Sequence, residues 1–137
     1  MSSKPSVACR LVACREQLED GKDWSFYLIN DSVAPFRDVF LERVSSEWGS
    51  MHAVEVANVS HGDIEVGGHG LLWRDDGSGA EFRMSAHVRL ESAALTVVLS
   101  FDIPKLYRRR ELPIVTGLGK TGLQVLPSDT VIGAVSR

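Results

Sequence analysis

The side chains best suited to chemistry lie in a glycine-rich stretch at residues 60–70. Two imidazoles and two carboxylates, the ligand types of catalytic zinc and non-haem iron, come from His61, Asp63, Glu65 and His69. One function that this ligand set suggests is a metal-dependent hydrolase with a loop site around His61, Asp63 and His69. Their spacing matches no ligand motif, however, and a glycine-rich loop holds metal ligands poorly. We therefore expect no catalytic residue, metal or cofactor, and keep this hydrolase as the alternative.

A second stretch, Gly117-Leu118-Gly119-Lys120-Thr121, ends like the phosphate-binding loop of nucleotide-binding proteins. The first glycine of that motif belongs five residues before Gly119, where this chain has Ile114. Pro127 also follows too soon for the helix whose N-terminus would bind the phosphate. The stretch is therefore predicted to be a tight glycine turn between two strands.

The two cysteines, Cys9 and Cys14, would lie about 16 Å apart and on opposite faces of a strand. They are expected to be free thiols, which favours a reducing, cytoplasmic compartment. The tetrapeptide Leu11-Val12-Ala13-Cys14 resembles the cleavage box of bacterial lipoproteins. Arg10 interrupts the apolar segment that such a signal requires, so the cytoplasmic assignment is preferred.

The charge balance limits the class of partner. The chain has 137 residues and a formal net charge of −3 at pH 7. Such a chain has no long-range attraction for phosphate backbones or anionic lipid. No segment approaches the ~20 apolar residues that a membrane span requires. Neither nucleic acid nor a membrane is expected as a partner.

Two consecutive runs of alternating apolar and polar residues, 82–90 and 95–103, must form the framework that positions any site. Alternation of this kind indicates strands with one buried face, and the short connection between the runs predicts an antiparallel hairpin. Residues 36–48 are harder to assign. Their apolar residues fall at helical spacing, while a strand also accommodates them with a poorer separation of faces.

Among the predicted strands and turns lie four short motifs: Phe26-Tyr27-Leu28-Ile29-Asn30-Asp31-Ser32, Phe36-Arg37-Asp38-Val39, Leu112-Pro113 and Gly119-Lys120. In these motifs the chain resembles small uncharacterised bacterial all-β proteins. The resemblance implies a β-sandwich but no activity and no functional residues. It favours a strand over a helix at residues 36–45.

The spacing of seven to nine short strands predicts an all-β protein with a single antiparallel β-sandwich, immunoglobulin-like or related. Residues 1–6 are expected to be a loose N-terminus and residues 7–127 the sandwich domain. Residues 128–137 are expected to be a C-terminal tail.

Three tryptophans, Trp24, Trp48 and Trp73, lie at or near predicted strand ends. Such residues usually cap a sandwich core with the indole N–H on a carbonyl, whereas two exposed together would form a binding patch. Trp48 and Trp73 are therefore the candidate binding residues. Because no catalytic constellation is evident, the sequence predicts a non-catalytic binding or assembly module. It would contact a protein partner or form a homodimer, and the sequence names no small-molecule ligand.

Overall fold

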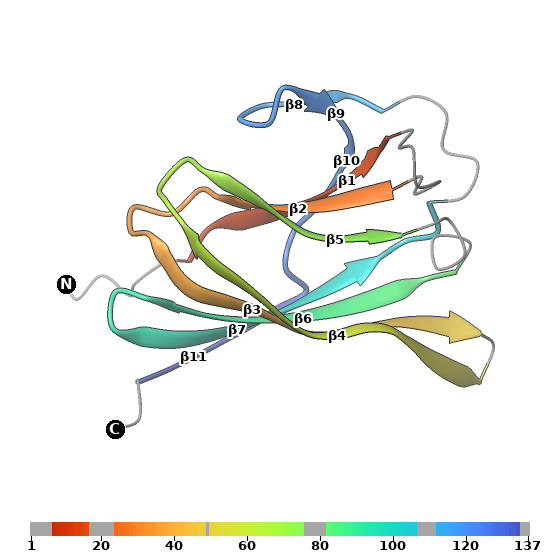
Figure 1. The fold of residues 1–137 in the computed structure, drawn as a ribbon, viewed down its shortest axis with the longest axis horizontal. Helices are drawn as coiled ribbons and strands as arrows, with labels where there is room; N and C mark the ends of the chain where they lie inside the picture. Colours follow the sequence, from red (N-terminus) through yellow and green to blue (C-terminus); the bar gives the residue numbers. More distant parts are fainter. Residues whose placement is uncertain (1–6, 17–23, 49, 76–81, 107–111, 135–137) are drawn as a thin grey trace.

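Two antiparallel sheets pack face to face in the computed structural model, which describes residues 7–16, 24–48, 50–75, 82–106 and 112–134 (Figure 1). The 4-stranded sheet has the order β10 (Leu123–Val125), β1 (Cys9–Arg15), β2 (Trp24–Asn30), β5 (His69–Asp75). The 5-stranded sheet has the order β11 (Asp129–Ala134), β7 (Leu95–Ile103), β6 (Met84–Ser92), β3 (Phe36–Trp48), β4 (Met51–Ile64). A separate hairpin joins β8 (Ile114–Val115) to β9 (Lys120–Thr121). The predicted all-β sandwich is confirmed.

The β6–β7 hairpin forms the centre of the 5-stranded sheet, as its alternation predicts. Ala86 pairs with Phe101 and Val88 with Leu99, and all four side chains are fully buried. A two-residue turn joins the strands, and both of its residues, Ala93 and Ala94, have positive φ. This is the backbone of a type I′ turn, whose twist matches that of the flanking strands.

Residues 36–48 form strand β3, which settles the choice between helix and strand. Phe36, Val39, Leu41 and Val44 are buried against the 4-stranded sheet. Their spacing departs from strict alternation because the β3–β4 pairing shifts register between Phe36 and Val39, where Asp38 has a φ of 50°. A β-bulge of this kind inserts a residue and moves the next side chain to the other face. The bulges therefore produce the helix-like spacing.

The two inner strands of the 4-stranded sheet, β1 and β2, are buried on both faces along most of their length. The inner face of this sheet contributes Leu11 and Leu28 to the main core, while Val12 and Ile29 belong to a smaller cluster on the outer face. That cluster includes Val115 from the β8–β9 hairpin, which lies over the outer face in Figure 1. Sheets with both faces covered lack clear alternation, which explains why the run Cys9–Arg15 of β1 shows no alternation of apolar and polar residues.

Two further elements differ from the expectations. Residues 129–134, expected within a tail, form edge strand β11 on β7, as suits the β-branched run Thr130-Val131-Ile132. Residues 60–64, expected in a loop, complete strand β4. No helix among the described residues is long and apolar enough to span a membrane.

Candidate functional site

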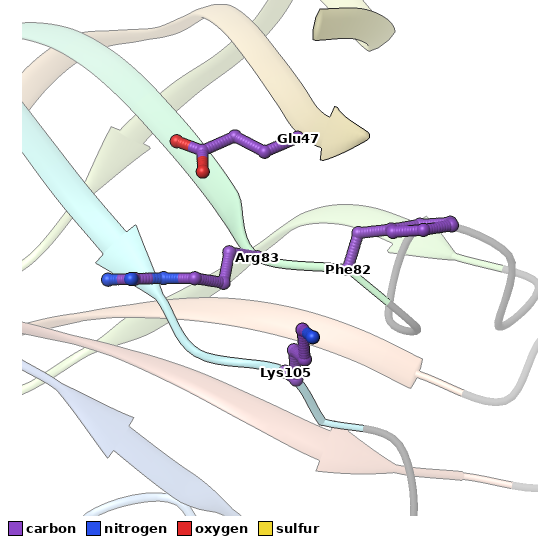
Figure 2. Close-up of a pocket in the computed structure, with 4 residues that line it drawn as sticks. All are labelled: Glu47, Phe82, Arg83 and Lys105. Carbon is purple, nitrogen blue, oxygen red and sulfur yellow. The ribbon is translucent and has the colours of Figure 1, made fainter. Parts of the chain in front are cut away.

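A hollow of about 340 Å³ lies where strands β3, β6 and β7 meet at one end of the sandwich. Its described lining residues are Glu47, Phe82, Arg83 and Lys105, which we call the Arg83 end (Figure 2). The strand pairing brings them together because Met84 pairs with Ile103, which sets the residues before β6 beside those after β7. The N–H of Glu47 donates to the carbonyl oxygen of Arg83 at 2.9 Å and joins β3 to the group.

The Arg83 end combines positive charge with an aromatic ring. Arg83 and Lys105 are exposed and Phe82 is half-buried. Figure 2 shows the side chains of Glu47 and Arg83 extending in the same direction, with the Phe82 ring pointing away from them. Lys105 takes part in another interaction of the chain, whereas Arg83 makes no ion pair with any described residue. The Arg83 guanidinium therefore has donors to offer a ligand carboxylate.

A second hollow, of about 330 Å³, lies on the outer face of the 5-stranded sheet. Its described lining residues are Glu42, Arg43, Asn58 and His87. His87 Nδ1 lies 3.2 Å from the hydroxyl of Ser100 on the neighbouring strand. One carboxylate and one guanidinium balance each other here, so this hollow selects the charge of a ligand less clearly than the Arg83 end does.

The structure does not bring His61, Asp63 and His69 together as the metal site of the alternative hydrolase would require. Asp63 forms an ion pair with Arg37 at 3.0 Å and accepts the N–H of Asp38 at 3.1 Å. The Asp38 N–H, followed by the Arg37 guanidinium, lowers the pKa of Asp63 below its usual range. This carboxylate is thus already bound within the protein.

The two histidines of that alternative belong to different sheets. His61 in β4 has its ring so close to Gly70 that a Cβ there would lie 2.3 Å from His61 Cε1. His69 in β5 has its ring edge-on to Tyr27, with centroids 5.9 Å apart. Among the residues that the structure describes, no group of three or more His, Cys, Asp or Glu could hold a metal ion. The hydrolase alternative gains no support from these positions.

The two predicted binding tryptophans have different positions. Trp73 is only 6% exposed and stacks on Phe26 with ring centroids 4.1 Å apart, so it packs in the core and offers no binding surface. Its indole N–H is buried without a partner among the described residues, contrary to the expected carbonyl contact. Trp48 ends strand β3 beside Glu47, and its side chain lies outside the described part of the chain.

Lys120, the lysine of the glycine motif, holds the β8–β9 hairpin onto the 4-stranded sheet. Its Nζ donates to Glu16 at 2.9 Å and lies 5.5 Å from the centre of the Tyr27 ring. Gly117 and Gly119 have positive φ, as the predicted glycine turn requires. Lys120 therefore stabilises the fold and is not available as the lysine of a phosphate-binding loop.

The alternation over residues 82–90 predicts that Phe82 lies on the buried face of the hairpin, whereas the structure leaves it half-buried just before β6. The sequence alone does not indicate Arg83 or Lys105 as binding residues. The site depends on the pairing register of β6 and β7. When the first residue of one antiparallel strand pairs with the last residue of its neighbour, the residues that flank the two strands lie side by side. The basic and aromatic character of those flanks is the signal that could have found this site. No family model, curated protein or solved structure matches the chain, so the resemblance to bacterial all-β proteins stays a prediction.

Proposed function

We propose that this protein is a non-catalytic binding module that takes an acidic segment of a protein partner at the Arg83 end. One observation carries the proposal: the exposed guanidinium of Arg83, without an ion pair among the described residues, lines a hollow beside a second cation and an aromatic ring. Residues at the ends of a β-sandwich, held by paired strands, are a common place for binding surfaces.

The composition of the hollow defines the chemistry of the partner. A carboxylate can accept two parallel hydrogen bonds from the Arg83 guanidinium, and the Phe82 ring can pack against an apolar neighbour of that carboxylate. Glu47 repels a second closely spaced negative charge. These features favour a protein segment in which one acidic residue lies next to an apolar residue. They disfavour a densely charged anion such as polyphosphate.

A cytoplasmic location belongs to the same proposal. Cys9 lies in the main core and Cys14 in the outer cluster, and both are buried free thiols. Burial, reinforced by the charge of Asp31, raises the pKa of Cys9 to about 12. Burial, reinforced by Glu16, raises the pKa of Cys14 to about 11. Thiols held protonated in this way are consistent with a reducing compartment, where disulfides are rare.

Selection of displayed random peptides on the immobilised protein tests the proposal. We expect enrichment of peptides in which Asp or Glu adjoins an apolar residue. The substitution Arg83→Ser should lower the affinity of the protein for these peptides about tenfold or more, because a hydrogen bond to a charged group contributes roughly 1.5–3 kcal/mol. The matched control is Arg74→Ser, which removes another exposed arginine that is not among those lining the hollow.

The same selection can refute the proposal. Peptides without an acidic preference, or peptides that bind the Arg83→Ser variant as tightly as the unmodified protein, would exclude a carboxylate site at Arg83. Failure to enrich any peptide above the level on an unrelated protein would count equally against it.

A further inference from the structure

Two exposed valines mark the opposite end of the sandwich. Val33, between β2 and β3, is 94% exposed, and Val66, between β4 and β5, is 52% exposed. We call residues 31–35 and 65–68 the Val33 end. β2 and β4 both finish there, whereas β3 runs from it to Glu47 at the Arg83 end. The two ends therefore lie at opposite ends of the same strands.

A buried asparagine holds both connections of the Val33 end in place. Asn30 has no exposed surface, and its side-chain amide donates to the carbonyl oxygens of Ala34 at 3.0 Å and Ile64 at 3.1 Å. Its N–H donates to the carbonyl oxygen of Gly68 and its own carbonyl accepts the N–H of Gly67. The valines are thus displayed on fixed loops, and docking them would cost little conformational entropy.

Carboxylates accompany these valines. Asp63 and Glu65 both form ion pairs with Arg37, at 3.0 and 2.8 Å, so two acids share one guanidinium. Asp31 forms a further ion pair, with Arg10 at 2.7 Å, and the exposed Asp38 adds a fourth carboxylate near the start of β3. The Val33 end is therefore an acidic surface with exposed apolar side chains, the composition that the Arg83 end is proposed to bind.

We propose that the acidic segment bound by the Arg83 end is the Val33 end of a second copy of this chain. This inference rests on the proposed function, because it names the partner of that site. The charges of the described residues are complementary. Two cations and one carboxylate line the hollow, whereas four carboxylates and two guanidinium groups lie at the Val33 end and at the adjoining ends of β3 and β4. The Phe82 ring supplies the apolar contact for the valines.

The geometry makes this contact head-to-tail. Each copy uses one end to bind and keeps the other end free, so the interface joins two different surfaces. Such a contact produces an open chain of copies or a closed ring. The two-fold homodimer expected from the sequence would instead use one surface twice, for example the exposed Val131 on edge strand β11.

Complementation between two blocked variants tests the inference by sedimentation velocity. Val33→Lys replaces an apolar contact by a positive charge that Arg83 and Lys105 repel, and Arg83→Glu reverses the charge of the hollow. Each variant alone should remain a monomer at concentrations where the unmodified protein forms larger species. A mixture of the two should form a heterodimer of one copy of each and nothing larger, because each retains the end that the other lacks. The control Val131→Asp should assemble like the unmodified protein.

Each other outcome overturns the inference. A mixture that stays monomeric excludes a head-to-tail contact, and loss of assembly in Val131→Asp identifies a symmetric edge dimer. Melting curves for every variant show that each remains folded. If the unmodified protein is monomeric throughout while acidic peptides still need Arg83, self-association fails and the proposed function stands. If the acidic peptides also bind the Arg83→Ser variant, both self-association through the Arg83 end and the proposed function fail.

Discussion

Replacing Ala94 by glycine should stabilise this protein. Ala94 is exposed and has a φ of 63° in the β6–β7 turn. An L-residue in this left-handed region costs roughly 1–2 kcal/mol, and glycine avoids that cost. Glycine also gains about 0.4–1 kcal/mol of entropy in the unfolded chain. The difference predicts that Ala94→Gly raises the free energy of unfolding by about 0.5–1 kcal/mol.

Urea unfolding followed by tryptophan fluorescence measures this change. The midpoint should rise with an unchanged slope, because the substitution exposes no additional surface. The matched control is Ala57→Gly in β4, an exposed alanine without positive φ, which should destabilise by roughly 0.5–1 kcal/mol. If Ala94→Gly lowers the midpoint as Ala57→Gly does, the positive-φ turn is refuted.

Three further substitutions test the packing and one ion pair. Phe101→Ala should lower the free energy of unfolding by about 3–5 kcal/mol in the same urea assay, because the ring is fully buried. Gly70→Ala should cost about 1–3 kcal/mol through overlap with the His61 ring, and adding His61→Ala should restore part of that loss in a double-mutant cycle. Burial alone raises the pKa of Glu16, but hydrogen bonds led by that from Lys120 lower it below 4.5. The ion pair of Glu16 with Lys120 therefore stabilises the fold above about pH 4.5, and this stabilisation is lost as the pH falls through the lowered pKa. Lys120→Met removes the pair, so the free energy of unfolding should then depend less on pH below pH 4.5. Unchanged acid sensitivity would contradict this ion pair.

The sandwich and its central hairpin follow directly from the sequence. In residues 84–92 and 95–103 one face is buried and the other is solvated, so apolar and polar residues alternate and fix the register. Where both faces are buried, as in β1, that signal disappears. Where a bulge interrupts the pairing, as at Asp38 in β3, the period changes and imitates a helix. Ambiguity in the sequence thus marked covered faces and bulges.

The candidate site was less predictable because long-range pairing assembles it. Glu47 comes from β3, while Arg83 and Lys105 flank the hairpin on either side. No local motif records that proximity. The residues with the clearest local chemistry, in contrast, serve the fold: Asp63 binds Arg37, and Lys120 binds Glu16. The spacing of residues along the chain indicates which side chains could bind a ligand. The pairing register of the sheets determines which of those side chains lie close together in the fold.

The distribution of covered surfaces points to the ends of the sandwich as the place for binding. The 4-stranded sheet has its inner face in the core and its outer face beneath the β8–β9 hairpin. On the outer face of the 5-stranded sheet, Arg89 lies over the Phe40 ring and 3.9 Å from Glu42, so described charges there are partly matched. The ends instead present Arg83 without an ion pair among the described residues and Val33 almost fully exposed. The guanidinium of Arg83 and the apolar side chain of Val33, which lies beside carboxylates, supply complementary chemistry, and the proposal that recognition takes place at the two ends rests on this physical argument.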